Sequence, residues 1–256
     1  MLDRIKVFLF LFFQARGLSS KLKLFRILFL AQIIPSRRSK HEMVTLKFKP
    51  FDLQFQVAQG ELTPFWEVAH SIAGIRPRLD SMRGKILMDG GANIGLFSLF
   101  CKDAERIIAI EPNPTVNRRL AENFRLNGIT GEVVQKALSS EEKQIRMNLR
   151  EGATVLSTVS GEGNAVVEAT TIDRLIEQYQ LPRVDLLKLD VEGHELESLA
   201  GAAKSLQNHV IRRLFVEYMS QEKLVALDAV LITKFGYRRT VTMSYNALYE
   251  YDGAGN

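Results

Sequence analysis

The chain has 256 residues, of which 46% are hydrophobic and 25% charged, with seven prolines and 17 glycines. These values lie near globular averages and exclude disordered, collagen-like and coiled-coil proteins, and the length suits one large domain with a small appendage. A single cysteine, Cys101, excludes an internal disulfide and a multi-cysteine zinc site, and fits a reducing compartment.

The net charge of +5 suggests nucleic-acid binding until it is localised along the chain. Residues 1–40 carry nine Lys and Arg against Asp3 alone, which is a net +8, so the remaining 216 residues carry −3. The basic charge therefore belongs to an N-terminal arm. We expect no nucleic-acid partner for the body of the protein.

The arm, residues 1–40, is also hydrophobic, with apolar runs over 5–13 and 24–34. Runs of 9 and 11 residues are too short to cross a bilayer, which takes about 17–25. Three interpretations stay open: helices that pack on the domain, an interfacial anchor whose Lys and Arg meet anionic lipid, or a signal peptide. We expect a cytoplasmic protein, which the anchor alternative would place peripherally at the inner face of the membrane.

Residues 41–80 are expected to form a β-hairpin and a helix that cap the mouth of the site. Alternating hydrophobicity over 44–49 and 53–57 predicts the hairpin. Thr63-Pro64 predicts a helix start, with the helix running to about Ile72. The residues expected on the inward face of the hairpin are Leu46, Phe48, Phe55 and Val57.

Residues 81–256 are expected to form the catalytic domain, because short apolar strands alternate there with helical stretches. The candidate strands are 85–89, 106–111, 131–138, 184–190 and 211–218. The candidate helices are 94–101, 115–127, 172–179, 194–207 and 220–235. This alternation predicts an α/β fold with a mostly parallel sheet covered on both faces. Residues 144–171 are β-rich, and 237–251 predict an antiparallel edge hairpin.

Ligands of such sheets bind at the carboxyl ends of the strands, where the first candidate strand runs into Met88-Asp-Gly-Gly-Ala-Asn-Ile-Gly95. Gly91 and Gly95 permit a tight turn. The G-x-G-x-x-G pattern of dinucleotide-binding folds is not present. Asp89 instead opens the turn with a negative charge, which could hold the ammonium of a methionine moiety directly or through water. The motif therefore favours S-adenosylmethionine over NAD.

Glu111 ends the second candidate strand, 22 residues after Asp89. A carboxylate at this position can accept hydrogen bonds from both hydroxyls of a ribose. The two acidic strand ends together predict a nucleoside-containing cofactor.

From about Lys85 to Tyr218 the chain resembles the FkbM-type family of S-adenosylmethionine-dependent methyltransferases, mostly O-methyltransferases of sugars and natural products. The motifs that carry the resemblance are Met88–Gly95, Ile110–Pro114, Ala137–Ser139, Thr170–Leu175 and Lys188–Leu196. The resemblance implies a class I methyltransferase fold with a seven-stranded sheet, and adenine packing near Asn113 and Ala137. The implied cofactor-binding residues are Asp89, Gly90, Gly91, Ala92, Asn93, Gly95, Glu111, Pro112, Asn113 and Ala137.

The fourth candidate strand carries the residues expected to be catalytic. Lys188 and Asp190 point to one face of the strand, and a buried lysine should pair with a carboxylate, of which Asp190 is the nearest in sequence. His194, at the start of the next helix, or Glu192 could act as the general base for a hydroxyl acceptor. Glu217 ends the fifth strand and should lie beside Asp190.

Two carboxylates and an imidazole, from Asp190, Glu217 and His194, could alternatively hold Mg²⁺ or Mn²⁺, although we expect no metal. His41, His70, His209 and Cys101 are expected to be structural.

The sequence thus predicts methylation of a hydroxyl on a saccharide, a lipid-linked glycan or a natural product, that is, on a small-molecule or glycan acceptor. N- or C-methylation and a catalytically silent, membrane-tethered cofactor-binding protein are the alternatives. No Asn/Asp-Pro-Pro-aromatic signature of N-methyltransferases follows the fourth strand, where Asp190-Val-Glu-Gly193 stands instead. The sequence predicts no oligomeric state.

Overall fold

The computed structural model describes residues 81–149 and 158–253, the backbone of 44–48 and 53–57, and residues 18, 21 and 22. The arm predicted over 1–40 and the helix predicted from Thr63 lie almost wholly outside these residues. Within the part that is described, no helix combines the length and hydrophobicity needed to span a bilayer.

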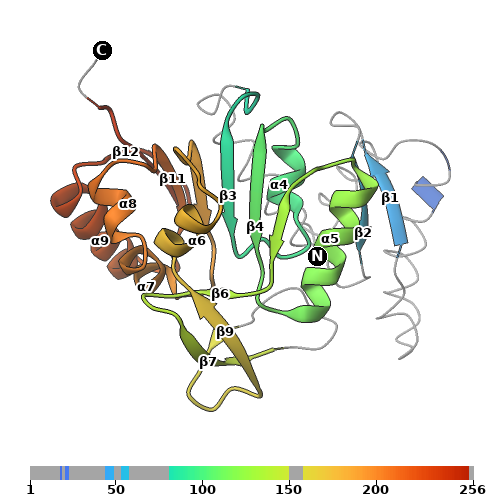
Figure 1. Cartoon of the computed structure of the whole chain (residues 1–256), viewed down its shortest axis with the longest axis horizontal. Coiled ribbons are helices and arrows are strands. Elements are labelled where there is room, and N and C mark those ends of the chain that lie inside the picture. The colour runs from blue at the N-terminus through green and yellow to red at the C-terminus, as the bar shows by residue number, and fades with distance from the viewer. Residues whose placement is uncertain are drawn as a thin grey trace.

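A seven-stranded sheet forms the centre of the protein, in the order β12-β13-β11-β10-β3-β4-β5 (Figure 1). Five of its strands run parallel: β3 (Ile86–Gly90), β4 (Arg106–Ile110), β5 (Glu132–Val134), β10 (Leu186–Leu189) and β11 (Arg213–Glu217). The antiparallel edge consists of β12 (Arg238–Thr242) and β13 (Asn246–Glu250). The mostly parallel sheet and the edge hairpin predicted from the sequence are both confirmed.

The strand order reverses between β3 and β10. From β3 the chain builds outward through β4 to β5, and it then returns to place β10 on the other side of β3. Connections that leave two neighbouring strands in opposite directions open a crevice at their carboxyl ends. The loops after β3 and β10 therefore meet where a ligand is expected.

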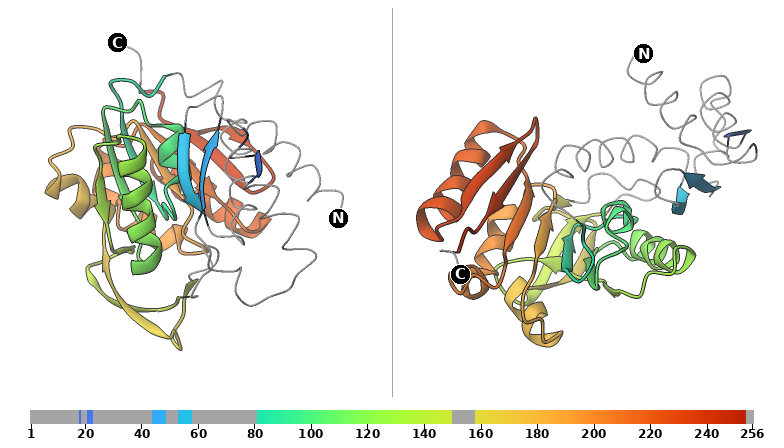
Figure 2. Two further views of the ribbon diagram at one scale, coloured as in Figure 1. Left: turned by 90° about the vertical axis from the view of Figure 1, so that its right-hand side faces the viewer. Right: turned by 90° about the horizontal axis from the view of Figure 1, so that it is seen from above.

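Two apolar layers enclose the sheet, as expected for parallel strands rich in Ile, Leu and Val (Figure 2). One layer packs against α4 (Leu96–Phe100) and α5 (Pro114–Leu126). The helices of the other layer are α6 (Ile172–Gln178), α7 (Glu195–Ala200), α8 (Ala203–Gln207) and α9 (Gln221–Asp228). Leu87, Leu187 and Leu214 are fully buried at the centre, so the sheet is a rigid base for its loops.

The predicted helix 194–207 is wrong in one respect, because it is divided into α7 and α8. The division falls at Gly201, where a Cβ atom would lie 2.1 Å from the carbonyl oxygen of Ser139. The backbone of another segment thus approaches this point too closely for a side chain. The predicted helix 220–235 is likewise α-helical only through α9 and continues as a π-helical turn, η3 (Ala229–Lys234).

The predicted strand 131–138 is also wrong as a single element. β5 ends at Val134 and belongs to the central sheet, whereas β6 (Ala137–Leu138) pairs with β9 (Ala165–Thr170). With β7 (Lys143–Asn148) and β8 (Thr158–Val159), these strands form a second sheet in the order β6-β9-β7-β8. Part of it extends at the bottom of Figure 1. The β-rich character predicted for 144–171 is confirmed.

The N-terminal hairpin is confirmed at the level of the backbone. β1 (Val44–Phe48) and β2 (Leu53–Val57) are antiparallel, with Leu46 opposite Phe55, and β2 lies beside α5 (Figure 1). The side chains of this hairpin lie outside the described part of the structure. Its role as a lid stays a prediction.

The close approach of the segments that follow β3 and β10 yields a prediction about Gly91. Its φ is +69°, and a Cβ atom there would lie 1.8 Å from the carbonyl oxygen of Asp190, whereas Gly128 has φ +64° with open space around it. Gly128→Ala should cost about 1 kcal/mol of unfolding free energy from backbone strain alone. Gly91→Ala should cost at least about 2 kcal/mol more, because the two loops must move apart. Urea denaturation measures both, and equal losses would contradict the close approach.

Candidate active site

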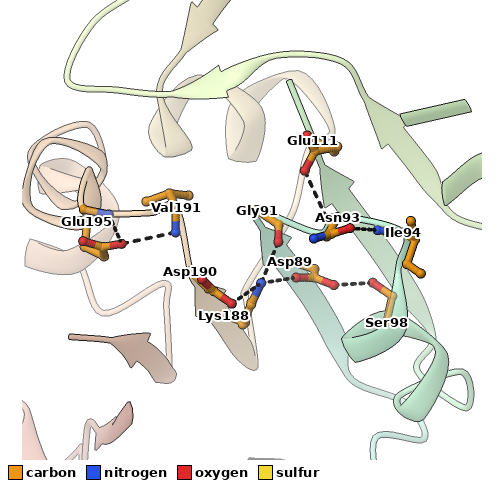
Figure 3. A network of polar contacts seen from close by, with 11 residues as sticks. Asp89, Gly91, Asn93, Ile94, Ser98, Glu111, Lys188, Asp190, Val191 and Glu195 are labelled. Atoms are coloured by element: carbon orange, nitrogen blue, oxygen red, sulfur yellow. Dashed lines mark hydrogen bonds and ion pairs between the residues drawn. The ribbon is translucent and has the colours of Figure 1, made fainter. Parts of the chain in front are cut away.

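Four strands of the central sheet end together and bring four acidic residues to one edge. Asp89 and Glu111 come from β3 and β4, and Asp190 and Glu217 from β10 and β11. Lys188 lies among them, and Figure 3 shows its contacts with Asp89, Gly91 and Asp190. The sheet topology therefore assembles residues that are up to 128 positions apart in the sequence.

Lys188 is the centre of this cluster and is 6% exposed. Its Nζ lies 3.4 Å from Asp89 Oδ1 and 3.4 Å from Asp190 Oδ2, and donates a hydrogen bond of 2.7 Å to the carbonyl oxygen of Gly91 (Figure 3). Burial lowers the pKa of Lys188, but the charges of Asp190, Asp89 and Glu217 outweigh it, and the net pKa is raised. The predicted pairing with Asp190 is confirmed, and Asp89 is a second partner that the sequence did not predict.

Asp89 is completely buried and its carboxylate faces the protein. Oδ2 accepts a hydrogen bond of 2.7 Å from Ser98 Oγ on α4, while Oδ1 has the nearby ammonium of Lys188 as its charge partner. Burial of an ion is tolerated when a counter-ion and hydrogen bonds accompany it. Asp89 thus ties β3 to β10 and α4, and its contact with a ligand ammonium stays a prediction.

The turn after β3 is held in a left-handed conformation at three positions. Gly91, Asn93 and Gly95 have φ values of +69°, +54° and +86°. The backbone N–H of Ala92 donates to the carbonyl of Ile110 at 2.9 Å, and that of Asn93 donates to Glu111 Oε2 at 3.1 Å. These bonds fix the turn against the end of β4, so the loop expected to hold the cofactor is preformed.

Glu111 is 7% exposed and receives one backbone N–H on each oxygen. Asn93 N lies 3.1 Å from Oε2 and Asn113 N lies 2.9 Å from Oε1. Burial raises the pKa of Glu111 to about 7, against the opposing effects of these N–H groups and of Lys188. A carboxylate oxygen has two lone pairs, so each oxygen can still accept one hydroxyl.

The remaining residues predicted to bind the cofactor lie beside this carboxylate. Asn113 is 4% exposed and caps α5, because its Oδ1 accepts from Thr115 N at 3.0 Å. Pro112 is half-buried between Glu111 and this cap, and Gly90 is buried at the end of β3. Ala137 is buried at the start of β6. The oxygen of Asn113 serves the helix, so the predicted adenine contact stays a prediction.

Asp190 and Glu217 lie side by side, as predicted. The parallel register places Leu189 opposite Val216, and the two carboxyl groups that follow form a hydrogen bond. Burial, the charge of Asp190 and this bond raise the pKa of Glu217 to about 9. The raised pKa favours the protonated form of Glu217 at neutral pH.

His194 occupies the N-cap position of α7. Its Nε2 lies 3.3 Å from Ser139 Oγ and its Nδ1 lies 3.8 Å from Glu197 Oε2. Burial lowers the pKa of His194. The charge of Glu197 raises this pKa, and the charges of Lys143 and Lys223 lower it further. The imidazole is therefore neutral at pH 7 and able to accept a proton.

The loop between β10 and α7 carries Glu192, at a φ of +55°. The carboxylate of Glu195 stabilises this loop, since Oε1 accepts from Gly193 N at 3.0 Å and from Val191 N at 3.2 Å (Figure 3). Glu192 is half-exposed on a loop with a fixed backbone.

No role was predicted from the sequence for three residues that shape the site: Ser98, Ser139 and Glu195. Ser98 and Glu195 could have been proposed as partners from their positions near the starts of helices. Ser139 could not, because its contact with His194 depends on the second sheet.

The alternative of a metal held by Asp190, His194 and Glu217 finds no support. Among the described residues, no group of three or more His, Cys, Asp or Glu side chains is arranged to hold a metal ion. The ammonium of Lys188 already supplies a positive charge between Asp89 and Asp190.

Comparison with known proteins decides the family. Residues 89–239, more than half of the chain, match the family model described as the methyltransferase FkbM domain. The chain belongs to the FkbM methyltransferase family. The resemblance found in the sequence motifs is therefore confirmed.

Among curated proteins, the FkbM chain is 35% identical over 124 residues to the hexuronic acid methyltransferase AglP of Haloferax volcanii. It is 31% identical over 171 residues to the methyltransferase sdnD of Sordaria araneosa. These matches cover 48% and 51% of the chain, and 52% and 65% of the relatives. The chain thus spans about half to two thirds of the length of these relatives.

Solved structures with a similar fold include human methyltransferase 10 domain containing protein, with a TM-score of 0.47 and 13% identity over 80% of this chain and 91% of that one. Fibrillarin of Aeropyrum pernix, solved with S-adenosylmethionine, has a TM-score of 0.44 and 13% identity over 85% of both chains.

The buried cluster predicts a strong dependence of stability on Lys188. Lys188→Met leaves the Asp89 carboxylate buried without its counter-ion and should cost about 3–5 kcal/mol of unfolding free energy. The double variant, Lys188→Met with Asp89→Asn, should be at least about 1 kcal/mol more stable than Lys188→Met alone, because the buried charge is then absent.

Urea denaturation of the two single variants and the double variant measures this coupling. Lys204→Met, at an exposed position on α8, is the control and should change stability by less than about 0.5 kcal/mol. Purely additive effects of the two substitutions would contradict the pairing.

Proposed function

We propose that this protein is an S-adenosylmethionine-dependent methyltransferase that methylates a hydroxyl oxygen of a small-molecule or glycan acceptor. The observation that carries the proposal is the arrangement at the reversal of the sheet order. There Glu111, which can accept ribose hydroxyls, lies on one side of the Gly91 turn and Asp190 on the other. Family membership and relatives named as methyltransferases support it.

The residues present fit this cofactor. Glu111 would hold the ribose, and the turn from Gly90 to Gly95 would run beneath the methionine portion with its backbone already fixed. Two carboxylates, Asp89 and Asp190, against the one ammonium of Lys188 leave this part of the site with a net negative charge, which suits a ligand with an ammonium and a sulfonium. When bound, S-adenosylmethionine supplies a methyl group on a positively charged sulfur.

Methylation of a hydroxyl requires a group of the protein to take up its proton. We assign this role to His194, because burial keeps its imidazole neutral and the carboxylate of Glu197 can stabilise the charge that follows protonation. Asp190 and the protonated Glu217 can accept and donate hydrogen bonds to orient the acceptor hydroxyl. Glu192 lies on the same edge and would contact the acceptor.

Titration calorimetry with S-adenosylmethionine tests the cofactor assignment. The intact protein should bind it, and the dissociation constant should rise as the pH falls below about 7. Binding weakens at low pH because Glu111, whose pKa is raised to about 7, becomes protonated. The protonated acid has one fewer acceptor for the ribose hydroxyls. Because one proton is involved, the rise should be at most about tenfold per pH unit.

Glu111→Gln should bind more weakly at pH 8 and lose this pH dependence. Glu177→Gln, at an exposed position on α6, is the control and should match the wild-type protein at every pH. If the intact protein fails to bind S-adenosylmethionine, the proposed function falls.

A further inference from the structure

Two large apolar side chains lie exposed at the same edge of the sheet as the candidate catalytic residues. Met219 is 57% exposed and Tyr245 is 64% exposed. Met219 follows Glu217 by two residues, and Tyr245 directly precedes Asn246, which pairs with Glu217 across β11 and β13. The backbone of both residues therefore lies next to Glu217, at the carboxyl end of β11.

The turn that carries Tyr245 is fixed by hydrogen bonds. Tyr218 N donates to the carbonyl of Tyr245 at 2.8 Å, and Met243 N donates to the carbonyl of Asn246 at 2.7 Å. The hydroxyl of Tyr218 also donates to the carbonyl of Met243. An aromatic ring exposed on such a preorganised frame can bind a ligand without first ordering the loop.

Met219 is connected to the candidate catalytic loop as well. A Cβ atom at Gly193 would lie 3.9 Å from Met219 Sδ, so the thioether passes close to the loop that carries Glu192 and His194. The apolar surface of Met219 is thus continuous with the loop after β10.

The electrostatic surroundings favour an uncharged ligand that donates hydrogen bonds. Burial has the largest effect on the pKa of Glu217 and raises it. The charges of Asp190, Glu192 and Glu195 raise this pKa further, which indicates a negative potential at the end of β11. A carboxylate on an acceptor would meet the same repulsion.

Two lysines, Lys188 and Lys223, lie at this edge and already have partners. They are outnumbered by the carboxylates of Asp89, Asp190, Glu192 and Glu195. Lys223 Nζ donates to the carbonyl of Gly193 at 3.1 Å, and Lys143 Nζ lies 2.9 Å from Glu141 Oε1. Hydroxyl groups, in contrast, can donate directly to the carboxylates at this edge.

We propose that Met219 and Tyr245 form the platform of the acceptor site, and that the adjoining carboxylates select an uncharged, hydroxyl-bearing pyranose ring. One face of the ring stacks on Tyr245, while its hydroxyls bond to Asp190 and Glu192. This inference rests on the proposed function and adds the substrate class. It predicts a preference opposite to a hexuronic acid, the substrate named for the relative in Haloferax volcanii.

The test uses methyl pyranosides of glucose, galactose and mannose, each paired with the uronide that differs only at C6. Saturation-transfer NMR with the full chain and saturating S-adenosylhomocysteine should show at least one neutral pyranoside binding more tightly than its uronide. Tyr245→Ala should raise that dissociation constant about fivefold to tenfold. Tyr245→Phe, which keeps the ring, should bind as the wild type does, as should Val225→Ala at an exposed site on α9.

Equal or tighter binding of every uronide, no binding of any pyranoside, or an unchanged constant for Tyr245→Ala would each overturn this inference. Calorimetry with S-adenosylmethionine separates that failure from failure of the proposed function. Tyr245→Ala should bind the cofactor as the wild type does, since Tyr245 lies beyond β11 and not in the Gly91 turn. If the intact protein binds the cofactor but fails the pyranoside test, only the acceptor platform is wrong.

Discussion

The ammonium of Lys188 holds together the two chain segments on which the site is built, the ends of β3 and β10. It bonds to the carbonyl of Gly91 at 2.7 Å and lies 3.4 Å from carboxylates at the ends of β3 and β10. In a medium of low polarity such a cluster is stable only if its charges stay balanced. Lys188 therefore fixes the ends of the two parallel strands against each other and places a positive charge beside the buried Asp89.

Charge balance at this edge also separates the roles of the acidic residues. Asp190 is partnered by Lys188, whereas burial and the charge of Asp190 raise the pKa of Glu217. Glu111 is held by two backbone N–H groups and has a pKa near neutrality. The pKa values of carboxyl groups at the ends of neighbouring strands thus differ because their partners differ, which suits Glu111 to the cofactor role proposed for it and Glu217 to the acceptor role.

Local features of the sequence predicted much of the fold and the site. Alternation of side chains along a strand placed Lys188 and Asp190 on one face, and the acidic residues after the strands lie together at one edge, as expected. What could not be predicted depends on contacts between distant segments. The Asp89 partner of Lys188 requires β3 and β10 to be neighbours, and the Ser139 partner of His194 requires the second sheet. The helix break after α7 similarly falls where the backbone of Ser139 approaches Gly201 closely.

The central claim is that this edge of the sheet transfers a methyl group to oxygen. The most direct measurement is incubation of the full chain with S-adenosylmethionine labelled in its methyl group and a cell extract, followed by identification of the labelled product. The account predicts a methyl ether at a hydroxyl, formed at least about a hundredfold more slowly by His194→Ala. A label attached to nitrogen or carbon, or transfer by His194→Ala at the wild-type rate, would contradict it.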